Sequence, residues 1–191
     1  MADAIDVVLM LLESAKQKQV TGRTVLQKMA YFANEKAKLG LAFAAHFYGP
    51  FSRQVSGAVD SLVASALISQ EVEEFLPRRS SMWEGRRYTY RLTPKGSQLT
   101  KGVAAELGQA VPKVKEVVGA IEQAGLSRDY MALAAASKVH YIVKRSRRPL
   151  NLSRISAEAK RVGWSLSEAE VRRVVRFLES LGMVRRVRAQ N

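Results

Sequence analysis

Three arginines near the C-terminus have the spacing of a phosphate-binding helix face. Arg172 and Arg176 are four residues apart with Arg173 beside them, on the side of the segment away from its apolar residues. A guanidinium group presents a planar fork of N–H donors that matches the oxygens of a phosphate group. We therefore expect this segment to contact the phosphates of a nucleic acid. The alternative is an ordinary solvated helix face, since basic faces without a binding role are common.

Other basic residues extend this group along the chain. Residues 1–125 hold 16 basic and 12 acidic residues, whereas residues 126–191 hold 15 and 5. The whole chain has 31 Lys and Arg against 17 Asp and Glu, a formal charge of +14 and a pI near 10.4. Such an excess favours an anionic partner over a merely solubilising role. The further candidates for phosphate contact at this end are Arg145, Arg147, Arg148, Lys160 and Arg161.

A second basic group lies in segment 77–85 and at the start of the strand that follows it. Its members are Arg78, Arg79, Arg86 and Arg87, and the segment also contains Trp83. An aromatic side chain at a basic hairpin tip can stack on a base or fill a partner's pocket, and it can also pack back onto the hairpin. The acids Glu71, Glu73 and Glu74 precede this group. We expect them to cancel part of its charge and to make it the weaker of the two nucleic-acid contacts.

The elements around this hairpin have the order typical of a winged helix. From 52 to 66, apolar residues recur at helical spacing. From 88 to 92, apolar and polar residues alternate, which indicates a half-buried strand whose antiparallel partner we expect over 69–76. Thr93 and Pro94 then start another helix, because threonine caps well and proline loses no hydrogen bond at the first helical position. We predict a winged helix-turn-helix with this hairpin as its wing.

Helical periodicity continues through most of the remaining sequence. It predicts helices over 3–18, 22–39, 94–107, 112–124, 127–145, 153–162 and 167–181, with a short strand over 41–47. The fold class is therefore mainly α with a small β-hairpin wing, or α+β. We place a winged-helix domain at 1–108 and a basic helical domain at 109–191. Residues 150–191 weakly repeat the order helix, turn, helix and strand, which favours a second winged-helix-like unit that lacks a full wing.

Caps and apolar faces give two further expectations. Ser153 and Ser167 are candidate helix caps, and Ser167 with Glu170 has the spacing of a capping box. Between Ile5 and Leu12 the first helix is apolar almost all round, which means burial on more than one side. It is either a central core helix or half of a subunit interface. Because DNA regulators often match two-fold half-sites, we expect a homodimer.

The composition argues against several other classes of protein. The chain has no cysteine, which excludes disulfides and thiolate metal sites, and only His46 and His140 are available for imidazole chemistry. Both histidines lie in apolar surroundings and are expected to be structural. No phosphate-cradling glycine loop, serine elbow or paired acids in an apolar cleft is present. We expect no catalytic residues, no metal and no cofactor, and we expect a cytoplasmic protein without a membrane span.

The exposed face of the predicted helix 52–66 raises an alternative function. It carries Arg53, Gln54 and Asp60 among small residues and is nearly neutral, which makes it a poor surface for reading DNA. These residues, together with Trp83, could instead contact a protein partner. The protein-interaction alternative therefore places its site in the first domain, whereas the nucleic-acid interpretation places it mainly in the second.

Several short motifs in the first hundred residues resemble a known family. Residues 22–33 contain Leu26-Gln27-Lys28 followed by an aromatic helix, and Tyr48-Gly49-Pro50-Phe51-Ser52 opens the next helix. This pattern is similar to that of the YwgA-like proteins and the related Panacea, or SocA-like antitoxin, domain. The resemblance to YwgA-like members implies a transcriptional regulator, whereas the resemblance to Panacea members implies toxin neutralisation or proteolytic adaptor work. The basic region from residue 126 onward lies outside the matched part.

The sequence as a whole favours a nucleic-acid-binding protein. We expect it to bind double-stranded DNA and to act in transcription regulation. The alternative is a protein-interaction module of the antitoxin or proteolytic-adaptor type. The charge of the C-terminal third favours the first interpretation, and the near-neutral helix 52–66 favours the second for the N-terminal domain.

Overall fold

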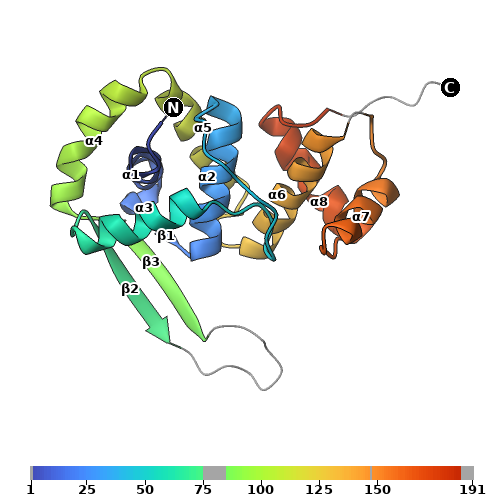
Figure 1. The fold of residues 1–191 in the computed structure, drawn as a ribbon, viewed down its shortest axis with the longest axis horizontal. Coiled ribbons are helices and arrows are strands. Elements are labelled where there is room, and N and C mark those ends of the chain that lie inside the picture. Colours follow the sequence, from blue (N-terminus) through green and yellow to red (C-terminus); the bar gives the residue numbers. More distant parts are fainter. Residues whose placement is uncertain (1, 75–84, 147, 186–191) are drawn as a thin grey trace.

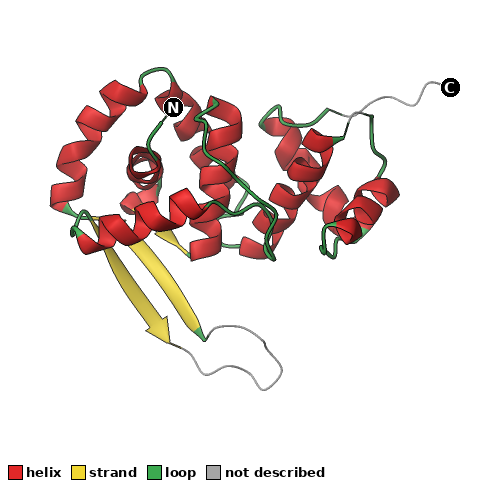
Figure 2. Cartoon of the chain, viewed as in Figure 1, coloured by secondary structure: helices red, strands yellow, loops and turns green. Residues whose placement is uncertain are grey.

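The computed structural model describes residues 2–74, 85–146 and 148–185. Over these ranges the chain is mainly helical, with a small three-stranded antiparallel sheet (Figures 1 and 2). This arrangement confirms the α+β class predicted from the sequence. In the same ranges, no helix is long and apolar enough to cross a membrane.

The N-terminal half alternates helices with the three strands. Its elements are α1 (Ala4–Ser14), β1 (Gln19–Thr21), α2 (Arg23–Ala37), α3 (Arg53–Ala64), β2 (Ile68–Glu74) and β3 (Arg86–Leu92). The hydroxyl of Ser52 caps α3 by accepting a hydrogen bond from the N–H of Val55 at 3.3 Å. The apolar stripe of α3, including Val55 and Leu62, is buried. The helix predicted over 52–66 is thus confirmed, except that it ends at Ala64 and Ala66 is exposed at positive φ.

Strand β1 is absent from the sequence prediction, which extends the first helix to residue 18. Helix α1 ends at Ser14, and a short 3-10 turn over Lys16–Lys18 follows, with Gln17 and Lys18 at positive φ. Strand β1 then pairs with β3, placing Val20 opposite Tyr90, and the sheet order is β1-β3-β2. Three residues are too few for a strand to be recognised by alternation. Pairing with a distant strand decides this element.

The strand predicted over 41–47 is wrong. This segment forms only one isolated bridge, between Ala44 and Phe51. The side-chain oxygen of Asn34 in α2 accepts a hydrogen bond from the N–H of Leu41 at 2.8 Å, and the ring of Phe43 packs against Tyr31 at 5.3 Å between centroids. The alternation in the sequence therefore reflects packing of a loop against α2, and not strand pairing.

The hairpin formed by β2 and β3 projects from the helical body (Figure 1). Its register runs from Ile68 opposite Leu92 to Glu74 opposite Arg86. Strand β3 has the predicted alternation, with Tyr90 and Leu92 buried. The predicted tip of the hairpin, with Arg78, Arg79 and Trp83, lies outside the described residues.

Helix α1 occupies the centre of the N-terminal core. Val7, Val8 and Leu11 are fully buried in the single chain. Helices α3, α4 (Pro94–Leu107) and α5 (Ala110–Gln123) pack around α1, and α5 also packs against α2. The all-round apolar character of α1 is explained within one chain, which removes the observation on which the predicted homodimer was based. The domain boundary predicted at 108 lies in the turn between α4 and α5 and stays a prediction.

Three helices form the C-terminal part. They are α6 (Tyr130–Arg145), α7 (Leu152–Arg161) and α8 (Glu168–Ser180), and they pack against one another in pairs. Ser167 and Glu170 form the predicted capping box at the start of α8. Helix α7 is capped by Asn151, and not by Ser153 as predicted, through a bond from the N–H of Arg154 at 2.9 Å. Residues 181–185 form no strand, so the strand predicted to follow the last helix is not seen within the described ranges.

Candidate nucleic-acid interface

Helix α8 exposes the three arginines that the sequence singled out. Val171, Val174 and Leu178 face the core formed with α6 and α7 and are buried. Arg172, Arg173 and Arg176 are exposed on the remaining surface of the helix. The periodicity therefore separates the two faces of α8 as predicted, and the basic side chains are accessible to an anionic partner.

The three arginines differ in their local partners. The Arg173 guanidinium donates to Asp129 Oδ2 at 2.8 Å, and Asp129 Oδ1 also accepts from the N–H of Ala132 to cap α6. Arg173 therefore ties α8 to the start of α6, and its charge is partly balanced. Within the described ranges, Arg172 and Arg176 make no ion pair. These two residues are the arginines of α8 that have no ion pair in the described ranges, although the helix as a whole carries three arginines and three glutamates.

The first turn of α8 is less favourable for phosphate. Glu168 and Glu170 lie there, where acidic residues stabilise the positive end of the helix dipole. Hydrogen bonds from the backbone N–H and the hydroxyl of Ser167 lower the pKa of Glu170 below its ordinary value. Glu170 is therefore a carboxylate at neutral pH, and we expect phosphate contacts on α8 to begin beyond this turn.

Helix α7 adds a second basic surface. Lys160 and Arg161 are exposed at its C-terminal end, and Arg161 pairs with Glu158 at 2.8 Å. Arg154 is exposed on the same helix and was not predicted as a site residue. Arg154, Glu158 and Arg161 together line one open groove. The spacing of seven residues between Arg154 and Arg161, two helical turns, is the sequence signal that could have identified Arg154.

The basic residues between α6 and α7 are divided between local contacts and the surface. The Arg145 guanidinium lies over the Tyr141 ring, 5.2 Å from its centroid, and donates to its hydroxyl at 3.2 Å. Lys144 pairs with Glu35 of α2 at 2.7 Å. Arg148 is exposed at the same groove as Arg154, whereas Arg147 lies outside the described residues. Of the described residues in this group, Arg148 is the one that lines the groove.

The arginines at the base of the hairpin are engaged by acids on the opposite strand. Arg86 pairs with Glu74 at 2.9 Å, and Arg87 pairs with Glu73 at 3.4 Å. These pairs follow directly from the register of β2 and β3. The expected charge cancellation by Glu73 and Glu74 therefore has a geometric basis. The two described strands of the hairpin carry three arginines against three glutamates, whereas α7 carries three basic residues against one glutamate.

The residues of the protein-partner alternative lie on the surface of α3. Arg53, Gln54 and Asp60 are all exposed. Gln54 is not entirely available, because its side-chain oxygen accepts a hydrogen bond from the N–H of Ala42 at 2.9 Å. Trp83 lies outside the described residues. The exposed face of α3 is nearly neutral, as the sequence indicated.

The short motifs of the first domain come together around the start of α3. Gln27 forms two hydrogen bonds with the backbone of Ser52: its Nε2 donates to the carbonyl at 3.0 Å, and its Oε1 accepts from the N–H at 3.1 Å. Lys28 Nζ donates to the Pro50 carbonyl at 2.7 Å. Burial, together with the charge of Lys138, lowers the pKa of Lys28 to about 7. Gln27 and Lys28 therefore hold the turn that precedes α3.

The same turn is fixed against α6. Gly49 has φ +94°, and a Cβ at this position would lie 2.7 Å from Ser137 Oγ. Only glycine combines this backbone conformation with this close approach. The carbonyl of the neighbouring His46 accepts a hydrogen bond from Trp164 Nε1 at 2.7 Å. This loop therefore joins the N-terminal body to the turn between α7 and α8.

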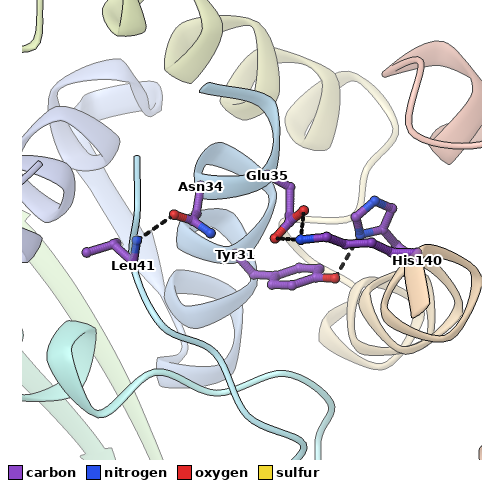
Figure 3. A network of polar contacts seen from close by, with 6 residues as sticks. Tyr31, Asn34, Glu35, Leu41 and His140 are labelled. Atoms are coloured by element: carbon purple, nitrogen blue, oxygen red, sulfur yellow. Dashed lines mark hydrogen bonds and ion pairs between the residues drawn. The ribbon is translucent and has the colours of Figure 1, made fainter. Parts of the chain in front are cut away.

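A polar network also joins α2 to α6 (Figure 3). The Tyr31 hydroxyl and His140 Nδ1 share a hydrogen bond of 2.7 Å, and Glu35 pairs with Lys144 beside them. Burial lowers the pKa of His140 to about 4 and raises that of Tyr31 well above its ordinary range. His140 is therefore neutral at physiological pH. This contact agrees with the structural role expected for His140.

Metal binding finds no support in the described part of the chain. No group of three or more His, Asp and Glu side chains there could hold a metal ion.

No protein-family model matches the chain, and no curated protein matches it either. The resemblance to the YwgA-like and Panacea families stays a prediction.

Proposed function

We propose that the protein binds double-stranded DNA through α7 and α8 and acts as a transcriptional regulator. The observation that carries this proposal is which exposed arginines already have an acidic partner. Arg154, Arg172 and Arg176 are exposed and lack an ion pair in the described part of the chain, whereas Arg86 and Arg87 are paired with glutamates. Basic side chains that are not already neutralised can replace the counterions condensed on DNA.

The arrangement of α7 and α8 is compatible with helix-turn-helix recognition. The two helices pack together, and the turn between them is anchored by the buried side chains of Trp164 and Leu166. In such motifs the second helix lies in the major groove. Helix α8 would take that place, with Arg172 and Arg176 reaching the phosphates or base edges that flank it. Because Glu168 and Glu170 occupy the first turn of α8, the contact region would lie in its later turns.

We further propose that residues 4–92 form a winged helix. The order α1, β1, α2, α3, β2, β3 and the sheet order β1-β3-β2 support this assignment. In a winged helix that reads DNA, α3 would be the recognition helix. Its near-neutral surface is poorly suited to that role. We propose that this unit serves mainly as a scaffold, because the turn before α3 contacts the C-terminal helices through Gly49 and His46.

A titration of duplex DNA at several salt concentrations tests the proposal. We expect binding whose affinity falls steeply with salt, by about 0.9 log units per log unit of salt for each phosphate neutralised. The double variant Arg172→Glu, Arg176→Glu should weaken binding strongly, because it reverses two exposed charges that have no ion pair in the described part of the chain. Arg86→Glu with Arg87→Glu is the matched control, with the same change in net charge but at paired positions, and it should weaken binding less.

Two results would refute this assignment. Absence of binding at low salt would remove the nucleic-acid function. A larger effect of the hairpin variant than of the α8 variant would move the binding surface to the first unit. Arg173 is left unchanged in this design because its replacement would also break the contact with Asp129 that caps α6.

A second function, protein interaction, is favoured by one exposed aromatic cluster. The Phe47 side chain is 65% exposed, its ring contacts Tyr48 at 4.9 Å between centroids, and Tyr48 contacts Tyr130 at 6.5 Å. Exposed aromatic groups of this kind are enriched at protein interfaces. Photo-crosslinking in cells that produce the protein tests this alternative. A photo-crosslinking amino acid replaces Phe47, and one at the exposed Leu99 of α4 is the control. A protein adduct of defined mass at position 47 alone would support it, and equal labelling at both positions would contradict it.

A further inference from the structure

An arginine-lined groove lies along one side of α7. It has a volume of about 510 Å³ and is formed by the connection between α6 and α7 together with one face of α7. The connection contributes Ser146, Arg148 and Leu150, and the helix contributes Arg154, Glu158 and Arg161. The groove thus brings together basic side chains that are separated in the sequence. It is distinct from the exposed face of α8.

Among the described lining residues, positive charge exceeds negative charge. Three guanidinium groups face one carboxylate, that of Glu158, which already pairs with Arg161 at 2.8 Å. Arg148 and Arg154 have no acidic partner in the described ranges. A concave basic surface concentrates its electric field in the groove and attracts anions more strongly than a flat one. The groove therefore has the electrostatic character of an anion site.

The backbone around the groove holds its walls in place. The Ser146 hydroxyl donates to the Arg148 carbonyl at 2.7 Å and accepts from the Arg148 N–H at 3.2 Å, which fixes the backbone of Arg148. The N–H of Arg154 donates to the Asn151 cap, so Arg154 belongs to the first turn of α7. The backbone of both unpaired arginines is therefore held by hydrogen bonds.

The position of Arg154 gives a separate argument for an anionic ligand. Cations are disfavoured in the first turn of a helix, because the helix dipole places partial positive charge there. Arg154 adds to this positive charge instead of compensating it, unlike Lys160 and Arg161 at the other end of α7. An anion in the groove would be stabilised by Arg154 and the helix terminus together. The favourable interaction of a cation with the C-terminal end of the helix dipole accounts for Arg161 without any ligand. No such interaction accounts for Arg154 in the first turn.

We propose that this groove binds a phosphate group of a nucleic-acid backbone, an inference that rests on the proposed function. Guanidinium forks match phosphate oxygens, and the apolar side chains of Leu150 and Ala157 in the lining suit contact with a sugar. The bound chain would then contact two surfaces, the groove along α7 and the exposed arginines of α8. A free phosphorylated small molecule presents the same chemistry, so the test separates the two sources.

The experiment compares Arg154→Ala with the wild type in two titrations. Alanine retains the helix of α7, and Lys101→Ala, at an exposed position of α4, is the control with the same charge change. The first titration measures duplex DNA binding as a function of salt. Loss of one phosphate contact should lower the salt slope by about 0.9 and weaken binding about eightfold at 0.1 M salt. The second titration follows backbone amide NMR signals on addition of inorganic pyrophosphate.

The outcomes separate this inference from the proposed function. A reduced salt slope in Arg154→Ala but not in Lys101→Ala supports the groove as a backbone contact, and Arg154→Lys should restore the slope in part. An unchanged slope in Arg154→Ala overturns the inference while duplex binding by the wild type stands. If the wild type binds no duplex, but pyrophosphate shifts the signals of residues 146–161 in an Arg154-dependent manner, the backbone source is overturned along with the proposed function. Failure of both titrations overturns the site altogether.

Discussion

Replacement of Lys28 by methionine tests the most deeply buried charge of the N-terminal body. Lys28 is 2% exposed, and Nζ donates to the Pro50 carbonyl at 2.7 Å. Burial, together with the charge of Lys138, lowers its pKa from 10.5 to about 7. Methionine has a similar length and flexibility but has no titratable group and cannot donate this hydrogen bond. The substitution therefore removes a titrating group while filling much of the same space.

The expected effect depends on pH. The unfolded chain keeps Lys28 protonated up to its ordinary pKa of 10.5, whereas the folded protein releases the proton near pH 7. Between these values the unfolded state binds more protons, so the free energy of unfolding of the wild type rises with pH. At about 1.36 kcal/mol per pKa unit, the contribution from pH 7 to pH 9.5 is about 3 kcal/mol. The methionine variant lacks this contribution.

The lost hydrogen bond acts differently. Leaving the Pro50 carbonyl without its donor should destabilise the variant by about 1–3 kcal/mol, and this term does not depend on pH. It shifts the whole stability curve of the variant without changing its slope. The difference between the two proteins should therefore grow by about 3 kcal/mol from pH 7 to pH 9.5, in favour of the wild type.

Urea unfolding followed by circular dichroism at pH 7, 8 and 9.5 measures this difference. The other titrating groups are present in both proteins, so their contributions cancel in the comparison. Lys101→Met, at an exposed position of α4, is the control and should follow the wild type at every pH. Parallel curves for Lys28→Met and the wild type would refute the reasoning, because they would show that Lys28 titrates alike in the folded and unfolded states.

Three other predictions concern His140, Gly49 and the oligomeric state. The pKa of His140 is about 4 in the folded protein, below its ordinary 6.5, so the unfolded state binds one more proton between these values. The free energy of unfolding should therefore fall by about 3 kcal/mol as pH drops from 6.5 to 4. Acid unfolding of His140→Gln should lack this loss. Gly49→Ala should destabilise the protein by about 1–3 kcal/mol through its left-handed φ, with more from the overlap with Ser137 Oγ. Thermal unfolding checks this, and adding Ser137→Ala should recover only the overlap part. Light scattering tests the predicted homodimer: a mass of 21.2 kDa would contradict it, and twice that value would require an interface away from the buried faces of α1.

Local interactions account for the parts of the fold that could be predicted from the sequence. The stripes of α3 and α8, the alternation in β3, the Thr93 and Pro94 helix start and the Ser167 capping box all depend on residues within a few positions of one another. The exposure of Arg172, Arg173 and Arg176 follows from the same periodicity. These features involve side chains that meet within one helical turn or alternate along one strand, so their spacing in the chain determines them.

Contacts between distant residues account for the parts that could not be predicted. Strand β1 exists because Val20 meets Tyr90, and the loop over 41–47 follows α2 because Asn34 and Tyr31 bind it. The sequence left open whether α1 was a core helix or a subunit interface. Only the packing of α3, α4 and α5 around α1 decides between them.

The candidate site divides in the same way. Its excess of positive charge is a property of the sequence, and so is the division of α8 into a basic and an apolar face. Tertiary structure alone decides which charges remain unbalanced, because Arg173 meets Asp129 and Lys144 meets Glu35 only after folding. It also brings Arg148 and Arg154 to one groove. The charge of a side chain is set by its residue type, but its partners are set by the fold.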